Sequence, residues 1–129
     1  MILRATAVGF VLWLIATLAF RFLGPSFFTP ALATHALAFI ATPVATAAIA
    51  FFLLRMLRAA PGDEAEAAIG VAFPGMILDA IVVNNFPIAF PGIDETLDGV
   101  FGAHMLLAYA AIIFTGLYFT RLAPQDERI

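Results

Sequence analysis

The chain alternates four long apolar segments with short links that are rich in proline, glycine and charged residues. Each segment holds roughly 20 residues or more, enough for an α-helix to cross a hydrocarbon core about 30 Å thick. The pattern therefore predicts an all-α fold, an integral membrane four-helix bundle that forms a single domain over residues 1–129. The expected spans are residues 5–23, 31–57, 65–85 and 97–122.

Composition supports this assignment and excludes several classes of function. Hydrophobic residues make up 64% of the 129 residues and charged residues only 12%, which is far from the composition of soluble domains. The chain has no cysteine, so disulfides and thiolate metal ligands are excluded. Its net charge is −3 and no basic stretch is present, so nucleic acid is not an expected partner. The expected partners are the lipid bilayer and either further copies of the chain or a larger membrane complex.

The basic residues, all of them arginine, are unevenly distributed over the links and the ends of the chain. Because cytoplasmic loops of membrane proteins carry an excess of basic residues, the distribution predicts the orientation of the chain. We expect both termini to be cytoplasmic, with only Arg21 near the opposite face. The arginines expected on the cytoplasmic side are Arg4, Arg55, Arg58, Arg121 and Arg128.

The third apolar segment contains a proline and a carboxylate in the stretch Phe73–Asp79. A carboxylate near the centre of a bilayer costs about 2.5–3.5 kcal/mol on insertion scales, so Asp79 should face other helices, a partner or water. Pro74 should bend the helix just before it. Asp79 is therefore the first candidate for a functional residue.

Several polar residues should lie at the same depth as Asp79 once the helices alternate in direction, all within about 10 Å of one another along the membrane normal. One interpretation is a structural polar core, in which Asp79 pairs with Arg21 and each histidine bonds a carbonyl or hydroxyl group. The other is an outward-facing site for a small molecule or a proton, covered by the link at residues 86–93. The candidate residues are Arg21, His35, Asp79, Asn84 and His104.

A third interpretation is a membrane redox protein. His35, Asp79 and His104 are residue types that can hold a divalent metal, and two histidines on facing helices can hold a haem. The spacings His-x-x-x-His and Glu-x-x-His are absent, however, so the sequence predicts no cofactor outright. No nucleophile elbow, phosphate loop or acid–base pair is present either, so we expect no catalytic residues. Trp13 is interpreted as a packing residue.

Four stretches of the chain resemble a family of small four-span bacterial membrane proteins known only as a domain of unknown function. These stretches are residues 13–21 (WLIATLAFR), 73–79 (FPGMILD), 86–91 (FPIAFP) and 108–110 (AYA). The resemblance implies a four-helix fold in a bacterial cytoplasmic (inner) membrane and gives weight to Arg21 and Asp79, without implying any activity. Together the observations favour a ligand-binding, transport-related or accessory subunit over a catalyst.

Overall fold

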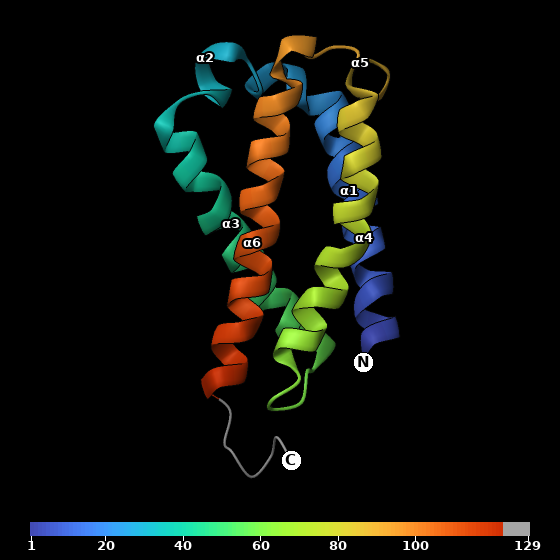
Figure 1. Ribbon diagram of the computed structural model, residues 1–129, viewed down its shortest axis with the longest axis vertical. Coiled ribbons are helices and arrows are strands. Elements are labelled where there is room, and N and C mark those ends of the chain that lie inside the picture. The colour runs from blue at the N-terminus through green and yellow to red at the C-terminus, as the bar shows by residue number, and fades with distance from the viewer. Residues whose placement is uncertain (123–129) are drawn as a thin grey trace.

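The computed structural model describes residues 1–122, and over these residues every regular element is a helix (Figure 1). Four helices are long and apolar enough to cross a membrane, which confirms the predicted all-α fold. Three short elements lie in the links at the end away from the termini of the described chain, Met1 and Leu122: α2 (Pro30–Ala33), α5 (Phe86–Ala89) and the 3₁₀ turn η1 (Glu95–Leu97). The long helices are α1 (Ile2–Phe27), α3 (Ala36–Leu57), α4 (Glu64–Asn84) and α6 (Asp98–Leu122).

The second predicted span is divided into two helices. Thr29 caps α2 by accepting the N–H of Leu32, and the ring of Pro30 suits the first helical turn. The chain then leaves the helix, and His35 caps α3 with its Nδ1, which accepts the N–H of Leu37 at 3.2 Å. In both helices a side chain satisfies one of the first free backbone N–H groups, and this capping residue fixes where the helix starts.

Prolines lie inside three of the long helices, namely Pro25 in α1, Pro43 in α3 and Pro74 in α4. Proline lacks a backbone N–H, but membrane helices tolerate it because neighbouring groups satisfy the freed carbonyl. For this reason α1 continues through Pro25 to Phe27, beyond its predicted end at residue 23.

The long helices pack in the order α1, α4, α6, α3, whereas α1 and α3 have almost no direct contact. Glycines permit the closest approaches. Gly9 on α1 lies against the carbonyl of Val71, and Gly116 on α6 lies against Ala68 of α4, with no room for a Cβ at either glycine. Small residues at interfaces allow membrane helices to pack closely without a hydrophobic force between them.

Two clusters of buried side chains lie at opposite ends of the four helices. The small-residue core, near the termini, consists of Ala5, Ala50, Leu54, Leu57, Ala67, Ala68, Val71, Ala72 and Ile112. The aromatic core, below α2 and α5, consists of Phe28, Ala33, Val82, Phe86, Phe90, Ile93, Leu97 and Phe101.

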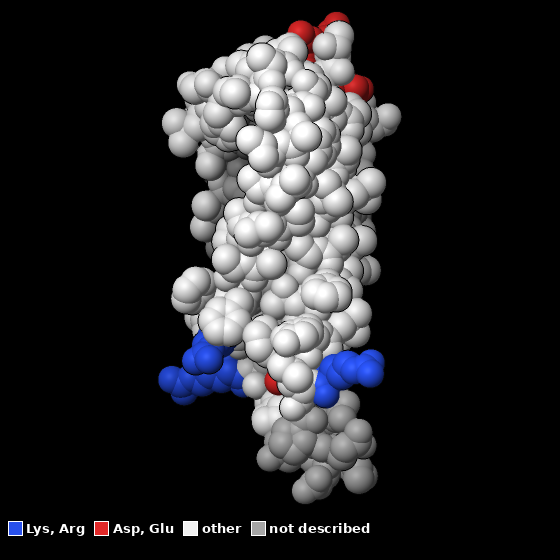
Figure 2. Space-filling model, turned by 90° about the vertical axis from the view of Figure 1, so that its left-hand side faces the viewer, with Lys and Arg blue, Asp and Glu red and all other residues white. Residues whose placement is uncertain are grey.

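Charged side chains separate along the long axis of the molecule. Figure 2 shows basic side chains near the end that carries the termini, and most of the visible acidic ones at the opposite end. The helix bounds place Arg4, Arg55, Arg58 and Arg121 at the first end, while Arg128 lies outside the described residues. Between the two ends, large apolar side chains such as Phe52 are exposed, as expected for surfaces that face lipid.

Candidate functional site

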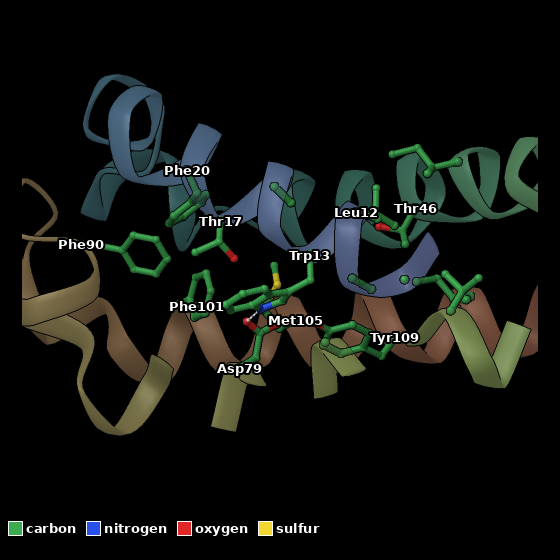
Figure 3. A pocket seen from close by; sticks show the side chains of 17 residues that line it. Leu12, Trp13, Thr17, Phe20, Thr46, Asp79, Phe90, Phe101, Met105 and Tyr109 are labelled. Atoms are coloured by element: carbon green, nitrogen blue, oxygen red, sulfur yellow. Dashed lines mark hydrogen bonds between the residues drawn. The ribbon is translucent and has the colours of Figure 1, made fainter. Parts of the chain in front are cut away.

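Asp79 is buried between three helices, with 6% of its surface exposed. Its Oδ1 accepts the indole N–H of Trp13 on α1 at 2.8 Å, and its Oδ2 accepts the hydroxyl of Tyr109 on α6 (Figure 3). Both carboxylate oxygens therefore act as acceptors, which is the arrangement that suits an ionised carboxylate. Of the three surroundings expected for Asp79, namely other helices, a partner or water, the structure shows other helices.

Gly75, one turn before Asp79 on α4, makes this contact with Tyr109 possible. A Cβ at Gly75 would lie 2.5 Å from the Tyr109 hydroxyl, so the ring could not rest against α4 if any larger residue stood there. The stretch Phe73–Asp79 thus supplies both the carboxylate and the space for its partner.

A cavity of about 200 Å³ lies beside Asp79, between the aromatic core and the small-residue core. All four long helices line it, together with one residue of the link after α4. Asp79 is the only charged residue among the 17 that line it. Thr17 and Thr46 add hydroxyl groups to the lining, beside the indole N–H of Trp13 and the hydroxyl of Tyr109. The lining aromatic residues are Trp13, Phe20, Phe90, Phe101 and Tyr109.

The lining residues of the cavity are not equally buried on the four helices. Every lining residue contributed by α4 or α6 is buried or half-buried. Two lining residues are exposed, Ala16 on α1 and Ile49 on α3, and the side chain of Ile49 is 47% exposed. The cavity is therefore least covered between α1 and α3.

The predicted ion pair between Arg21 and Asp79 is wrong: within residues 1–122 the carboxylate bonds Trp13 and Tyr109 instead. Arg21 is exposed near the end of α1. Neutral N–H and O–H donors satisfy a carboxylate without a counter-charge, so the buried acid does not require the arginine. Asn84, the last residue of α4, is likewise exposed and does not line the cavity.

His104 is buried, with 4% of its surface exposed, and both of its ring nitrogens are hydrogen-bonded. Its Nε2 lies 2.8 Å from the carbonyl oxygen of Ala33, and its Nδ1 lies 2.8 Å from the hydroxyl of Thr42. Because a carbonyl can only accept, we assign the proton to Nε2, so that Nδ1 accepts from Thr42. The ring also stacks on Phe39, with 4.2 Å between ring centroids. These are the bonds that the structural interpretation predicted for a histidine.

The predicted shared site of His35, Asp79 and His104 is also wrong. His35 is exposed and caps α3, and neither histidine lines the cavity beside Asp79. Among the residues that the structure describes, no group of three His, Asp or Glu side chains is placed to hold a metal ion. The geometry gives no support to a haem or metal held by these residues.

Two residues of the site, Trp13 and Tyr109, escaped prediction from the sequence. Trp13 lies one helical turn before Thr17 on the same face of α1, and both line the cavity. An indole N–H or phenol O–H in the middle of a membrane span needs a hydrogen-bond partner. This requirement could have identified both residues as candidate partners of Asp79.

Residues 27–122 match a family of unknown function, DUF5367. Comparison with curated proteins and with solved structures gives no match. The matched region contains Asp79, Tyr109 and His104, and it begins at the last residue of α1, after Trp13. Since the match spans well over half of the sequence, the chain belongs to this family of unknown function, DUF5367.

Proposed function

We propose that the protein binds a small organic cation in the cavity beside Asp79, as a ligand-binding or transport-related membrane subunit. The observation that carries the proposal is a buried carboxylate that is the only charged residue lining a cavity formed mainly by aromatic and aliphatic side chains. Such a lining disfavours strongly hydrated ligands, while the carboxylate favours a positive charge.

Aromatic rings strengthen the preference for a cation. The faces of Trp and Tyr attract an organic ammonium group, and cages of such rings recognise quaternary ammonium ligands. Trp13 and Tyr109 both contact Asp79 and line the cavity, so they can present ring surface beside the carboxylate. A ligand with a charged nitrogen and an apolar body would use all of these groups.

The volume of the cavity limits the ligand to a small molecule. A protein cavity of about 150 Å³ lined by apolar residues can hold benzene. The cavity beside Asp79, at about 200 Å³, has room for a slightly larger body such as an arylalkyl ammonium ion.

The proposal places the protein in a bacterial inner membrane with both termini in the cytoplasm. The arginines at the terminal end of the helices support this orientation, because basic residues are retained on the cytoplasmic side. The cavity then lies in the half of the membrane nearer the outer face, since Asp79 is within two turns of the end of α4.

Binding can be measured directly, because Trp13 is the only tryptophan of the chain and lines the cavity. Purified full-length protein titrated with benzyltrimethylammonium should show a saturable change in tryptophan fluorescence. Asp79→Asn should weaken the affinity at least tenfold, since loss of the charge partner in a desolvated site costs more than about 1.4 kcal/mol. Neopentylbenzene, the uncharged isostere of the probe, should bind more weakly than the cation.

The matched control is Asp94→Asn, which removes an exposed carboxylate away from the cavity. This variant should bind benzyltrimethylammonium with wild-type affinity. If Asp79→Asn also binds the probe with wild-type affinity, the carboxylate does not recognise a cation and the proposal fails.

A further inference from the structure

Both ends of the cavity beside Asp79 are closed by packed side chains. Toward the end that carries α2 and α5, the aromatic core covers the cavity. Two side chains of that core, Phe90 and Phe101, are only 1% and 3% exposed. Toward the termini, the small-residue core covers it, and the guanidinium of Arg4 on α1 donates to the carbonyl of Leu57 at the end of α3. Packed side chains therefore cover the cavity at both ends.

The sides of the cavity are closed by packed helices except at one place. α4 packs against α1 on one side and α6 on the other, and α6 packs against α3. The remaining neighbours, α1 and α3, have almost no backbone contact, although Arg4 of α1 bonds the last residue of α3. The two exposed residues of the lining, Ala16 and Ile49, belong to these two helices.

We infer that the ligand reaches Asp79 from the lipid, through the gap between α1 and α3, and that the site therefore takes amphiphilic cations dissolved in the bilayer. This inference rests on the proposed function, because it specifies the ligand class and route of the same cavity. A lateral opening lets a long alkyl chain stay in the lipid while the ammonium group lies at Asp79. A closed cavity of this volume would exclude such a chain.

A reversible bridge across the gap tests the route. Because the chain has no cysteine, Ala16→Cys and Ile49→Cys would supply its only two thiols, which bis-methanethiosulfonate linkers of graded length can join. The bridged protein should take up and release benzyltrimethylammonium more slowly by about tenfold or more, and reduction of the linker should restore the rates. Each single-cysteine variant, treated with the same linkers, carries the added bulk at the gap without a bridge and should be slowed less than the bridged protein.

A second test substitutes one residue at the gap between α1 and α3 and needs no linker. Ala16→Phe places a bulky ring at the gap, whereas Ala19→Phe places the same ring at an exposed position of α1 that does not line the cavity. Only Ala16→Phe should slow association of the probe. Benzyldimethyldodecylammonium should bind wild-type protein in lipid vesicles at least as tightly as the trimethyl probe, at equal mole fraction in the membrane.

The outcomes separate the route from the site. Unchanged rates in the bridged protein, or exclusion of the dodecyl probe while the trimethyl probe binds, would overturn the lateral route and leave the binding site intact. Binding of both probes that does not depend on Asp79 would instead refute the proposed function, and with it the inference.

Discussion

At the scale of single residues, hydrogen bonds at the site offset the free-energy cost of burying a carboxylate. An ionised carboxylate that is buried without partners costs several kcal/mol, and each hydrogen bond to a charged group recovers about 1.5–3 kcal/mol. Asp79 receives two such bonds, from Trp13 and Tyr109, which belong to different helices. The carboxylate therefore links α1 and α6 to α4, and it lies beside the cavity.

Of this arrangement, the inward orientation of Asp79 could be predicted from the sequence, but its partners could not. The cost of a charge in lipid requires Asp79 to face protein, whatever the other helices do. Its partner depends on how each helix is rotated, and the rule that opposite charges pair favoured Arg21. The rotation of α1 points Trp13 toward α4 and leaves Arg21 exposed, which apolar periodicity alone does not resolve.

Removing the Tyr109 hydroxyl should destabilise the fold, because it leaves a buried carboxylate oxygen without its donor. We expect Tyr109→Phe to lower the free energy of unfolding by about 1–3 kcal/mol, measured by denaturant titration in mixed micelles. Tyr118→Phe is the matched control on the same helix, since Tyr118 is exposed, and it should change stability by less than about 0.5 kcal/mol. Equal effects of the two substitutions would show that the Tyr109 bond to Asp79 contributes nothing specific.

At the scale of elements, His104 joins α6 to both halves of the divided second span. Its Nε2–H donates to a carbonyl of α2, while its Nδ1 accepts from Thr42 of α3. The division was not predicted, because the chain is mostly apolar on both sides of Thr34 and His35 and only the capping side chains mark the helix starts. His35 and His104 look equivalent in the sequence, but one caps a helix in an exposed position and the other is buried between helices.

Thr42→Val should loosen this junction, since it keeps the shape of the side chain but removes the donor to a buried ring nitrogen. The expected loss is about 1–3 kcal/mol of unfolding free energy. Hydrogen exchange should also become faster in α2 and the first turns of α3. Thr115→Val is the control, because the hydroxyl of this buried threonine bonds only the carbonyl of Ala111 in its own helix. If exchange rates are unchanged in Thr42→Val, the bond between Thr42 and His104 does not hold the junction.

At the scale of the whole molecule, the number of long helices follows from the apolar segments, but their arrangement does not. A short link between successive helices favours their packing as neighbours, and this holds for α4 and α6. It fails for α1 and α3, which scarcely touch although only residues 28–35 separate them, and α3 and α4 pack weakly although only residues 58–63 join them. The aromatic side chains of the two links, including Phe28 and Phe86, form the core that holds the helix ends instead. The cavity lies between helices packed in this order, and no local pattern in the sequence predicts the order.

The orientation of the whole molecule yields the last prediction. Arg4, Arg55, Arg58 and Arg121 lie at the end of the helices that carries the termini, and translocating them would oppose the bias that keeps basic residues in the cytoplasm. Single cysteines at Ser26 and Glu95, exposed positions of the opposite end, should therefore react with a membrane-impermeant thiol reagent added to intact spheroplasts. A cysteine at Ala60, exposed in the link between α3 and α4, should react only after permeabilisation. Because the chain has no cysteine of its own, each signal comes from one known position. The reverse labelling pattern would invert the proposed orientation and move the cavity to the cytoplasmic half of the membrane, while the contacts around Asp79 would stay the same.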